Sequence, residues 1–528
     1  MDRTNARDDR TQVLISGAGP TGLLLAGELR RRGVDCLLID ELEAPRGWDR
    51  ATVIHPRSLE IFDALGLAEQ FLDEGVETRA ARFHSSGEVL GELDLALAES
   101  PYRFDLGLSE EVTERVLTTY LDSLGGSVMR STRLVGFTQE PGHVSATLAR
   151  RGASFEVRAE WLVGCDGLHS VVREHSGIGF PGSDIPQPWA VFDASIAGWN
   201  RDYDVVAAFL DVPPVILTPL PGRRWRAYMH PSSDESDLVA EASRVLHLYA
   251  PGAEFTEVEN PTRFHCHSRV AARYRSARAL LAGDAAHVCT PAEGHGMNTG
   301  LQDAFNLGWK LALVCRGIAP QRLLDTYEIE RRPVAERIVR SGTDTEAAQT
   351  LTDAAARAER DAGMRLSFHD PETAHHEVAA AAEIDRSYAG SPIVSGEDSA
   401  GIAAGGLLPT TMPADHPATG PSFLHRVAHR PGHTVMVLGG PAADHGGVAQ
   451  LVERLEAEHR GSATVEAVFG FSTHPNRDAI GRIDEVVAER AGIHGVTLLA
   501  IRPDRYVGMR HDGADSDAVT RYVESVTG

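Results

Sequence analysis

The sequence of 528 residues predicts a mixed α/β and α+β protein. Three observations predict this class. A glycine-rich turn separates a buried-type strand from an apolar helix near the N-terminus, short alternating runs fill residues 183–265, and strands alternate with helices again after residue 406. At about 150 residues per domain the length fits three or four domains. A content of 42% hydrophobic residues is sufficient for packed cores.

The charge balance excludes several functions. With 51 basic and 75 acidic residues the formal net charge is -24, so the chain lacks the electrostatic footprint of a protein that binds nucleic acid or an anionic membrane. Lys310 is the only lysine, which excludes a GxxxxGK[ST] phosphate loop and leaves a single residue for Schiff-base chemistry. Lys310 lies in an apolar helical run, 307–314, and we expect its stem to pack there while its charge reaches solvent.

The cysteines and the hydropathy pattern indicate the cellular context. The five cysteines form no CxxC pair and no disulfide framework, which favours a reducing compartment. The N-terminal residues are charged, and no stretch approaches ~18 consecutive apolar residues, so we expect a cytoplasmic enzyme. His265-Cys266-His267 is a minimal metal-binding pattern, but no third ligand lies near it in the sequence, and no metal site is expected.

A dinucleotide-binding signature occupies the first forty residues. The strand Val13–Ser16 leads into Gly17, Gly19 and Gly22 of a GxGxxG motif, and an apolar helix follows. In this context the glycines permit a tight turn, close approach of a pyrophosphate and close helix packing, while the helix N-terminus offers amides to the anion. Asp40 ends the next strand 23 positions after Gly17, where a ribose-binding acid is expected. Because an acid there disfavours a 2′-phosphate, the nucleotide is expected to be FAD or NAD.

Two later segments help to distinguish these nucleotides. A buried-type strand, Trp161–Cys165, runs into an Asp-Gly segment that starts at Asp166. A second strand, Ala279–Ala282, runs into a Gly-Asp segment that contains Asp284, and a glycine-rich loop at 294–300 opens a long amphipathic stretch. Each segment alone is a weak signal, but the three motifs occur in order along one chain.

Together these residues resemble a known family. The GxGxxG motif, the Asp-Gly and Gly-Asp segments, Arg50-Ala51 and residues 56–60 are similar to the single-component FAD-dependent aromatic hydroxylases, the class A flavoprotein monooxygenases typified by para-hydroxybenzoate hydroxylase. The resemblance implies a Rossmann-like FAD-binding domain, NADPH or NADH as co-substrate, O2 as oxidant and an aromatic small molecule as substrate. It also implies hydroxylation through a flavin C4a-hydroperoxide. We expect a monomer or a homodimer.

The resemblance assigns the cofactor residues. Gly17, Gly19 and Gly22 would cradle the FAD pyrophosphate, and Asp40 would bind the ribose. Further contacts would come from Arg50, Glu110, Asp166, Asp284, Gly296, Met297 and Asn298. The last three would place helix N-terminal amides against the negative charge of the reduced flavin. At Glu110 the sequence departs from the family, which often has glutamine there, and a carboxylate near the phosphates would need a partner arginine.

The catalytic residues are less sharply defined. The resemblance implies that Arg50 contacts the flavin region and that Pro291 frames the oxygen site together with the loop at 294–300. A phenolic substrate would benefit from a base that makes it phenolate-like. The sequence does not rank the candidates for this role, which are His55, Tyr228, His230 and His295.

The middle of the chain predicts an inserted sheet. Residues 183–265 alternate apolar and polar positions in short runs divided by turn residues, which indicates an antiparallel sheet. The resemblance makes this sheet the roof of the substrate cavity. The substrate-binding candidates are therefore residues of its strands: Phe192, Phe209, Leu210, Trp225 and Tyr228.

The domain boundaries follow from these patterns. Residues 1–182 and 266–388 would form the FAD-binding domain, and 183–265 the middle substrate-binding sheet. Residues 389–406 are rich in turn formers and predict a linker. Residues 407–528 resemble the thioredoxin-like third domain of the longer hydroxylases. All five cysteines precede residue 316, so this domain has no CxxC pair and is expected to be structural or interfacial.

Other functions stay open on the residues alone. The same flavin chemistry could perform Baeyer-Villiger oxidation or epoxidation. A nicotinamide dehydrogenase and a non-catalytic FAD-binding sensor are alternatives of another class. A flavin-dependent halogenase is disfavoured because the chain has no WxWxIP-like segment and no lysine outside the run that holds Lys310. By analogy, the substrate is expected to be a bulky, polyketide-type aromatic of antibiotic biosynthesis.

Overall fold

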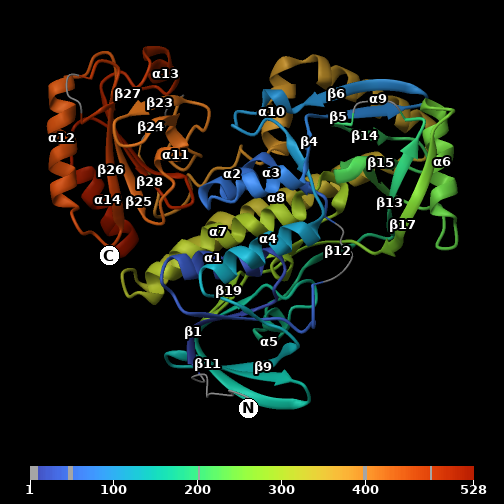
Figure 1. Ribbon diagram of the computed structural model, residues 1–528, viewed down its shortest axis with the longest axis horizontal. Coiled ribbons are helices and arrows are strands. Elements are labelled where there is room, and N and C mark those ends of the chain that lie inside the picture. Colours follow the sequence, from blue (N-terminus) through green and yellow to red (C-terminus); the bar gives the residue numbers. More distant parts are fainter. Residues whose placement is uncertain (1–9, 46–50, 200–202, 397–400, 476–478) are drawn as a thin grey trace.

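The computed structural model describes residues 10–45, 51–199, 203–396, 401–475 and 479–528. They form an N-terminal domain, a middle region and a C-terminal domain, which meet around helices α7 (His295–Cys315) and α8 (Asp325–Gln349) in the centre of Figure 1. The predicted mixture of α/β and α+β structure is confirmed. Within the described ranges, no helix is long and apolar enough to cross a membrane.

A mainly parallel sheet forms the base of the N-terminal domain. Its strand order is β19-β20-β11-β1-β2-β8; only β19 runs antiparallel to its neighbour, and β9 and β10 extend β11 as an antiparallel layer. The strands are β1 (Arg10–Ser16), β2 (Cys36–Ile39), β8 (Val128–Met129), β9 (Thr132–Glu140), β10 (His143–Arg150), β11 (Ala153–Gly164), β19 (Arg275–Ser276) and β20 (Ala279–Leu281). The apolar run Val13–Ile15 is fully buried because parallel strands are covered on both faces.

Helices cover this sheet. Helix α1 (Pro20–Arg31) starts directly after the glycine turn, carries proline at its first position and two arginines in its last turn, and packs against α4 and α7. The other helices of this domain are α2 (Pro56–Ala64), α3 (Ala68–Glu74), α4 (Glu110–Ser123) and α5 (Val171–His175). Two small sheets join the loops: β3 (Val53–Ile54), β7 (Asp105–Gly107) and β4 (Val76–Thr78), and β12 (Gly182–Asp184), β18 (His267–Val270) and β21 (His287–Val288).

The middle region is built on one sheet. Its order is β17-β13-β16-β15-β14-β5-β6, with β5 (Ala80–Ser85), β6 (Glu88–Asp94), β13 (Trp189–Ala197), β14 (Val205–Phe209), β15 (Val215–Leu220), β16 (Arg224–Met229) and β17 (Glu254–Phe264). Helix α6 (Leu238–Tyr249) packs on one face, and α9 (Ala354–His369) and α10 (Pro371–Ala381) lie beside β6. The expectation of an antiparallel sheet confined to 183–265 was too narrow, because β14 pairs in parallel with β5. Two strands from residues 80–94 thus cover an edge that would otherwise lie unpaired.

The C-terminal domain has its own sheet, in the order β22-β29-β28-β25-β26-β27-β23-β24. Its strands are β22 (Ser395–Gly396), β23 (Pro413–His416), β24 (Gly420–Phe423), β25 (His433–Gly439), β26 (Val465–Ser472), β27 (Gly481–Arg482), β28 (Val496–Ile501) and β29 (Val507–Asp512), and its helices are α11 (Leu424–Val427), α12 (His445–Glu458), α13 (Glu485–Arg490) and α14 (Asp517–Thr527). Strands β25 and β26 are parallel and joined through α12, while β28 and β29 follow antiparallel. The thioredoxin-like assignment stays a prediction, which this order of elements supports.

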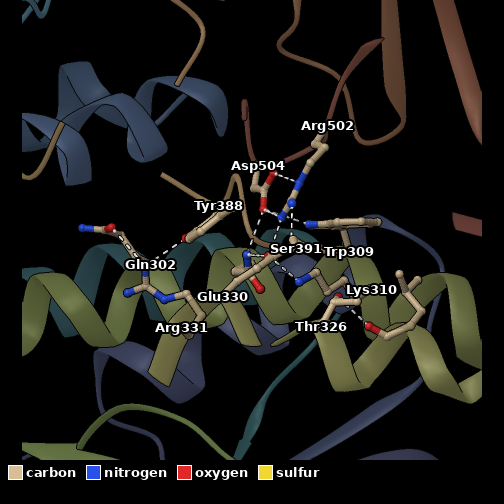
Figure 2. A network of polar contacts seen from close by, with 12 residues as sticks. Gln302, Trp309, Lys310, Thr326, Glu330, Arg331, Tyr388, Ser391, Arg502 and Asp504 are labelled. Atoms are coloured by element: carbon tan, nitrogen blue, oxygen red, sulfur yellow. Dashed lines mark hydrogen bonds and ion pairs between the residues drawn. The ribbon is translucent and has the colours of Figure 1, made fainter. Parts of the chain in front are cut away.

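The segment predicted as a linker is held between the domains. Just before the segment, the Tyr388 hydroxyl accepts a hydrogen bond from the guanidinium of Arg331 at 3.0 Å, and within it the Ser391 hydroxyl donates to Glu330 at 2.6 Å (Figure 2). Strand β22, from the same segment, pairs with β29 of the C-terminal sheet. These contacts fix the described part of the segment to both domains.

The expectation for Lys310 was wrong. Its side chain is fully buried, and its ammonium donates to Glu330 at 2.6 Å (Figure 2). The sequence reads as a half-exposed helix, but the C-terminal domain covers this face of α7: Trp309 and Leu313 belong to the same hydrophobic cluster as Val435 of β25. Burial lowers the pKa of Lys310 to about 8, while Glu330 opposes that shift.

Candidate active site

A cavity of about 1400 Å³ extends from the glycine turn of the N-terminal domain to the middle sheet. Most of the predicted site residues line it: Gly17, Gly19, Asp40, Glu110, Asp166, Leu210, Tyr228, Asp284, Pro291, His295, Gly296 and Met297. The cavity wall does not include Gly22, Asn298, His230, Phe192, Phe209 or Trp225. Arg50 lies outside the described residues.

The glycine turn presents bare backbone to the cavity. Gly17 has φ +102°, and a Cβ on it would lie 2.1 Å from the carbonyl oxygen of Cys165. A Cβ on Gly22 would lie 2.0 Å from the carbonyl oxygen of Gly17, so the turn closes only with glycine at both positions. Among the described residues, the nearest atom to a Cβ on Gly19 is a Glu114 oxygen at 3.9 Å, and no side chain caps α1. An open helix N-terminus of this kind fits a pyrophosphate.

Asp40 is held at the end of β2, beside this turn. Its Oδ2 accepts the backbone N–H of Ala18 at 2.8 Å, and its Oδ1 accepts the backbone N–H of Leu42 at 2.8 Å. Each carboxylate oxygen can accept a second hydrogen bond, and Asp40 lines the cavity. The residue is therefore fixed in a position where ribose hydroxyls can donate to it.

Asp166 and Asp284 lie at the same edge of the sheet. They follow β11 and β20, which are parallel neighbours, so the two strands end side by side. Arg173 joins the two segments by donating to the carbonyls of Ala285 at 3.0 Å and Leu168 at 2.6 Å. The Asp-Gly and Gly-Asp motifs thus form one wall of the cavity.

Asp166 has a buried oxygen that the described residues do not satisfy. Its Oδ2 accepts the backbone N–H groups of Val171 at 2.9 Å and Val172 at 3.3 Å, which fixes the side chain at the start of α5. Its Oδ1 is buried and has no hydrogen-bond partner among the described residues. Burial raises the pKa of this carboxyl. A donor on a bound nucleotide would satisfy the free oxygen, which fits the cofactor role predicted for Asp166.

The start of α7 forms a second open helix terminus. Gly294 adopts φ +73°, and no side chain in the described part of the chain caps the helix. The amides of its first turn, at Gly296 and Met297, are therefore available at the cavity. The Asn298 side chain has another role. It is fully buried, donates to the carbonyl of Val53 at 2.9 Å and accepts the backbone N–H of His55 at 3.0 Å, so it positions the helix start instead of lining the cavity.

Two histidine–carboxylate pairs lie under this loop. Nδ1 of His55 is 2.8 Å from Asp105, Nδ1 of His295 is 2.9 Å from Glu383, and the two rings are 4.9 Å apart. Burial lowers the pKa of His55, but the Asp105 carboxylate outweighs it and the pKa rises to about 9. Burial alone would raise the pKa of Glu383, yet His295 lowers it to about 2. Asp105 and Glu383 carry no sequence signature that could have identified them.

The residues of the middle sheet that were predicted to bind substrate lie on both of its faces. Phe192, Phe209 and Trp225 pack with α6 in a hydrophobic core, away from the cavity. Side chains along a strand alternate between its two faces. Leu210 directly follows Phe209, and Tyr228 is an odd number of positions after Trp225, so these two side chains line the cavity instead. The Tyr228 hydroxyl lies 2.8 Å from the hydroxyl of Thr52, which joins the middle sheet to the N-terminal domain.

His230 does not reach the cavity. Its ring lies 4.1 Å from that of Trp189, and burial lowers its pKa to about 4.

Several residues of the cavity wall had not been predicted. Most of them are apolar side chains on the cavity face of the middle sheet and on α9. They are Ala81, Phe83, Leu93, Val206, Ala208, Ile216, Thr218, Met364 and Phe368. The signal that could have identified the strand residues is the phase of the alternation.

The fold and the cavity define a dinucleotide-binding enzyme with a chamber for a second small molecule. Comparison with known proteins identifies the group. Residues 10–342 match the FAD binding domain family. The chain is 33% identical over 540 residues to 6-methylpretetramide 4-monooxygenase of Streptomyces rimosus. This alignment covers 98% of this chain and 94% of that protein. It is 36% identical over 400 residues to anhydrotetracycline monooxygenase of the same species, covering 72% and 77%.

Solved structures agree with this assignment. An anhydrotetracycline hydroxylase from Streptomyces rimosus superposes with a TM-score of 0.76 at 28% identity, over 98% of this chain and 99% of that one. Aklavinone-11 hydroxylase, solved with FAD and aklavinone, gives 0.76 at 25% identity over 99% of both chains. The chain therefore belongs to the FAD binding domain family and is a flavin-dependent monooxygenase. FAD is its cofactor, and the reaction uses O2 and NAD(P)H.

Proposed function

We propose that the protein hydroxylates a polycyclic, polyketide-type aromatic molecule that lies between the loop at 294–297 and the middle sheet. The cavity volume carries this proposal. At about 1400 Å³ it exceeds the roughly 300–1,000 Å³ of a site for one small ligand. It therefore has room for FAD and for a substrate of several rings. The names of the relatives, which give pretetramide and anhydrotetracycline as substrates, support the same class.

The residues at the glycine turn would hold FAD. Gly17, Gly19 and Asp40 are proposed to bind the pyrophosphate and the ribose of FAD. Asp166 and Asp284 are proposed to bind the rest of the linker between the two ring systems of FAD and the groups next to it. Bound FAD would supply the redox chemistry of the reaction, in which two electrons from NAD(P)H activate O2 so that one oxygen atom enters the substrate and the other leaves as water. The first-turn amides at Gly296 and Met297 would stabilise negative charge on the ring system, because a helix N-terminus is electropositive.

His55 would reinforce this electropositive site. With a pKa of about 9 its imidazole is protonated near neutral pH, so it acts there as a cation and not as a base. A Cβ on Gly294 would lie 3.5 Å from Nε2 of His55, which places the imidazolium directly under the loop. The carboxylate of Asp105, whose side chain is 17% exposed, keeps the proton on the ring.

Tyr228 is the proposed substrate contact. Tyr228 lines the cavity, and its hydroxyl forms a hydrogen bond with the hydroxyl of Thr52. The Tyr228 hydroxyl can therefore orient a phenolic or quinone oxygen. The surrounding wall is small and apolar at Val206, Ala208 and Ile216. Such a wall leaves space for a flat ring system and excludes water from the reacting carbon, and water would otherwise divert the oxidant to hydrogen peroxide.

The test is turnover with analysis of the product. Purified protein would be supplied with NADH or NADPH and a panel of phenols and polycyclic aromatics. We expect at least one polycyclic compound to accelerate NAD(P)H oxidation and to yield a product heavier by one oxygen atom. NMR of the product separates a new phenol from an epoxide or a ring-expanded lactone. Cofactor oxidation that yields only hydrogen peroxide with every compound would contradict the proposal.

A further inference from the structure

Three side chains that commonly bind metals meet at the contact between the N-terminal and C-terminal domains. Asp63 is in α2, His425 is in α11, and His429 follows α11. Nε2 of His425 is 3.3 Å from Oδ2 of Asp63, and Nε2 of His429 is 3.8 Å from the same oxygen. One potential ligand atom from each residue lies within 4.8 Å of the others. We refer to these residues as the interdomain triad.

The two separations from Asp63 are close to those around a bound metal ion. In a tetrahedral zinc site with Zn–N and Zn–O bonds of about 2.0–2.1 Å, neighbouring ligand atoms are about 3.3 Å apart. The His425–Asp63 separation already has this value, and His429 would move by about half an ångström to reach it. Two imidazoles and one carboxylate are also the ligand types that zinc takes in proteins with an open fourth position.

We propose that the interdomain triad binds one divalent transition-metal ion, Zn²⁺ being the ion that suits it, with water in the fourth position. The ion would clamp α2 of the FAD-binding domain to α11 of the C-terminal domain. The site is separate from the active site, because none of the three residues lines the cavity. The His425 side chain is fully buried, while those of Asp63 and His429 are 17% and 18% exposed, so the ion can enter from solvent on one side.

Neighbouring arginines set the condition for binding. Nε of Arg426 is 3.6 Å from Oδ2 of Asp63, the oxygen that the ion would use, and the side chain is 48% exposed. Arg505 is buried close to Asp63 and adds positive charge. The ion must therefore displace Arg426, which can swing into solvent. Because Arg426 and the ion would compete for the same Asp63 oxygen, removal of the Arg426 side chain should strengthen binding of the metal.

The experiment measures zinc directly on the full-length, FAD-loaded protein. The protein would be treated with a chelator, dialysed and titrated with Zn²⁺ by calorimetry, with the bound metal counted by mass spectrometry. We expect one Zn²⁺ per chain and a thermal unfolding temperature that rises with free zinc. Loss of a ligand in His429→Ala should weaken binding by at least ~10-fold, and Arg426→Ala should tighten it. His459→Ala, a half-buried histidine elsewhere in the same domain, should bind as the wild type does.

Each outcome decides the proposal. Stoichiometric binding that weakens in His429→Ala and not in His459→Ala supports it. No binding at one ion per chain, or equal binding by wild type and His429→Ala, overturns it and leaves an ion pair between Asp63 and its neighbours. If His429→Ala does not fold, the wild-type protein still gives a decision, because cobalt bound in a tetrahedral site with histidine ligands has a characteristic visible absorption and loosely bound cobalt does not.

Discussion

Arg502 and Glu330 form a fully buried, two-pronged ion pair between the C-terminal domain and α8. Nη1 and Nη2 of Arg502 each lie 2.7 Å from a Glu330 oxygen, and both side chains are fully buried (Figure 2). Asp504 accepts a second pair of bonds from Arg502, and Lys310 donates to Glu330. The C-terminal domain is thereby locked to helices α7 and α8, and α7 begins at the active-site loop.

Breaking this pair should destabilise the whole chain. In Arg502→Met, Glu330 keeps Lys310 but loses two of its buried hydrogen bonds, and removal of one partner of a buried ion pair costs about 3–5 kcal/mol. We expect a clear drop in the thermal unfolding temperature, followed by fluorescence. The control is Arg521→Met, which breaks an exposed pair with Asp515 and should change stability by less than about 0.5 kcal/mol. Equal drops in the two variants would contradict the role given to Arg502.

Gly17→Ala should abolish retention of FAD. A methyl group there would meet the Cys165 carbonyl at 2.1 Å, so the turn that fits the pyrophosphate must open. We expect purified Gly17→Ala to lose its yellow colour or to bind added FAD at least ~10-fold more weakly, a change of about 1.4 kcal/mol. Gly33→Ala is the matched control, since Gly33 also has positive φ, at +74°, but no atom of the residues that the structure describes lies within 4 Å of its Cβ position. Full FAD content in Gly17→Ala would show that the turn does not hold the cofactor.

Two neighbouring alanines of β14 should respond in opposite ways. The Ala208 side chain lines the cavity, and the Ala207 side chain packs in the core with α6. Ala208→Phe should raise KM for a polycyclic substrate or abolish its turnover while the unfolding temperature changes little. Ala207→Phe overpacks the core and should cost about 1–3 kcal/mol of stability, with KM less affected. Steady-state kinetics and thermal unfolding of both variants provide the check. The reverse pattern would mean that the cavity lies on the other face of the sheet.

The contribution of His55 to stability should fall as pH rises. Its pKa in the folded protein is about 9, above the ordinary value of 6.5. The stabilisation by Asp105 is therefore complete below pH 6.5 and is lost as pH rises through about 9. We expect the difference in unfolding temperature between wild type and His55→Gln to shrink between pH 6.5 and pH 9. The same difference measured in an Asp105→Asn background should depend much less on pH. A difference that grows with pH would contradict the assignment.

Local patterns in the sequence were sufficient to predict which of the proposed cofactor residues lie together at the cavity. Gly17, Gly19, Asp40, Asp166 and Asp284 each follow a strand within a few residues, and parallel strands bring such positions to one edge of a sheet. The family assignment and the flavin-dependent reaction followed from the same motifs. These predictions succeed because strand, turn and helix are close in sequence, so spacing alone fixes their geometry.

The substrate half could not be predicted in the same way. Whether Phe209 or Leu210 faces the cavity depends on which face of the sheet α6 covers, and α6 lies about thirty residues further along the chain. His55–Asp105 and His295–Glu383 are paired across 50 and 88 positions, and neither carboxylate belongs to a motif. Contacts between segments so far apart in sequence leave no local periodicity to detect.

The sequence by itself determined the family of this chain and showed that its single lysine supplies no phosphate loop. It also predicts that the N-terminal turn holds the dinucleotide and that the net charge disfavours polyanionic partners. Only the tertiary structure decided what that lysine does. The helix around Lys310 reads as an amphipathic surface helix, yet the C-terminal domain packs over it, and burial forces the ammonium to pair with Glu330. The sequence around a lysine is the same whether the residue ends up exposed or buried. Here the domain that covers Lys310 lies more than a hundred residues later in the chain, and this burial determines the partner of the lysine.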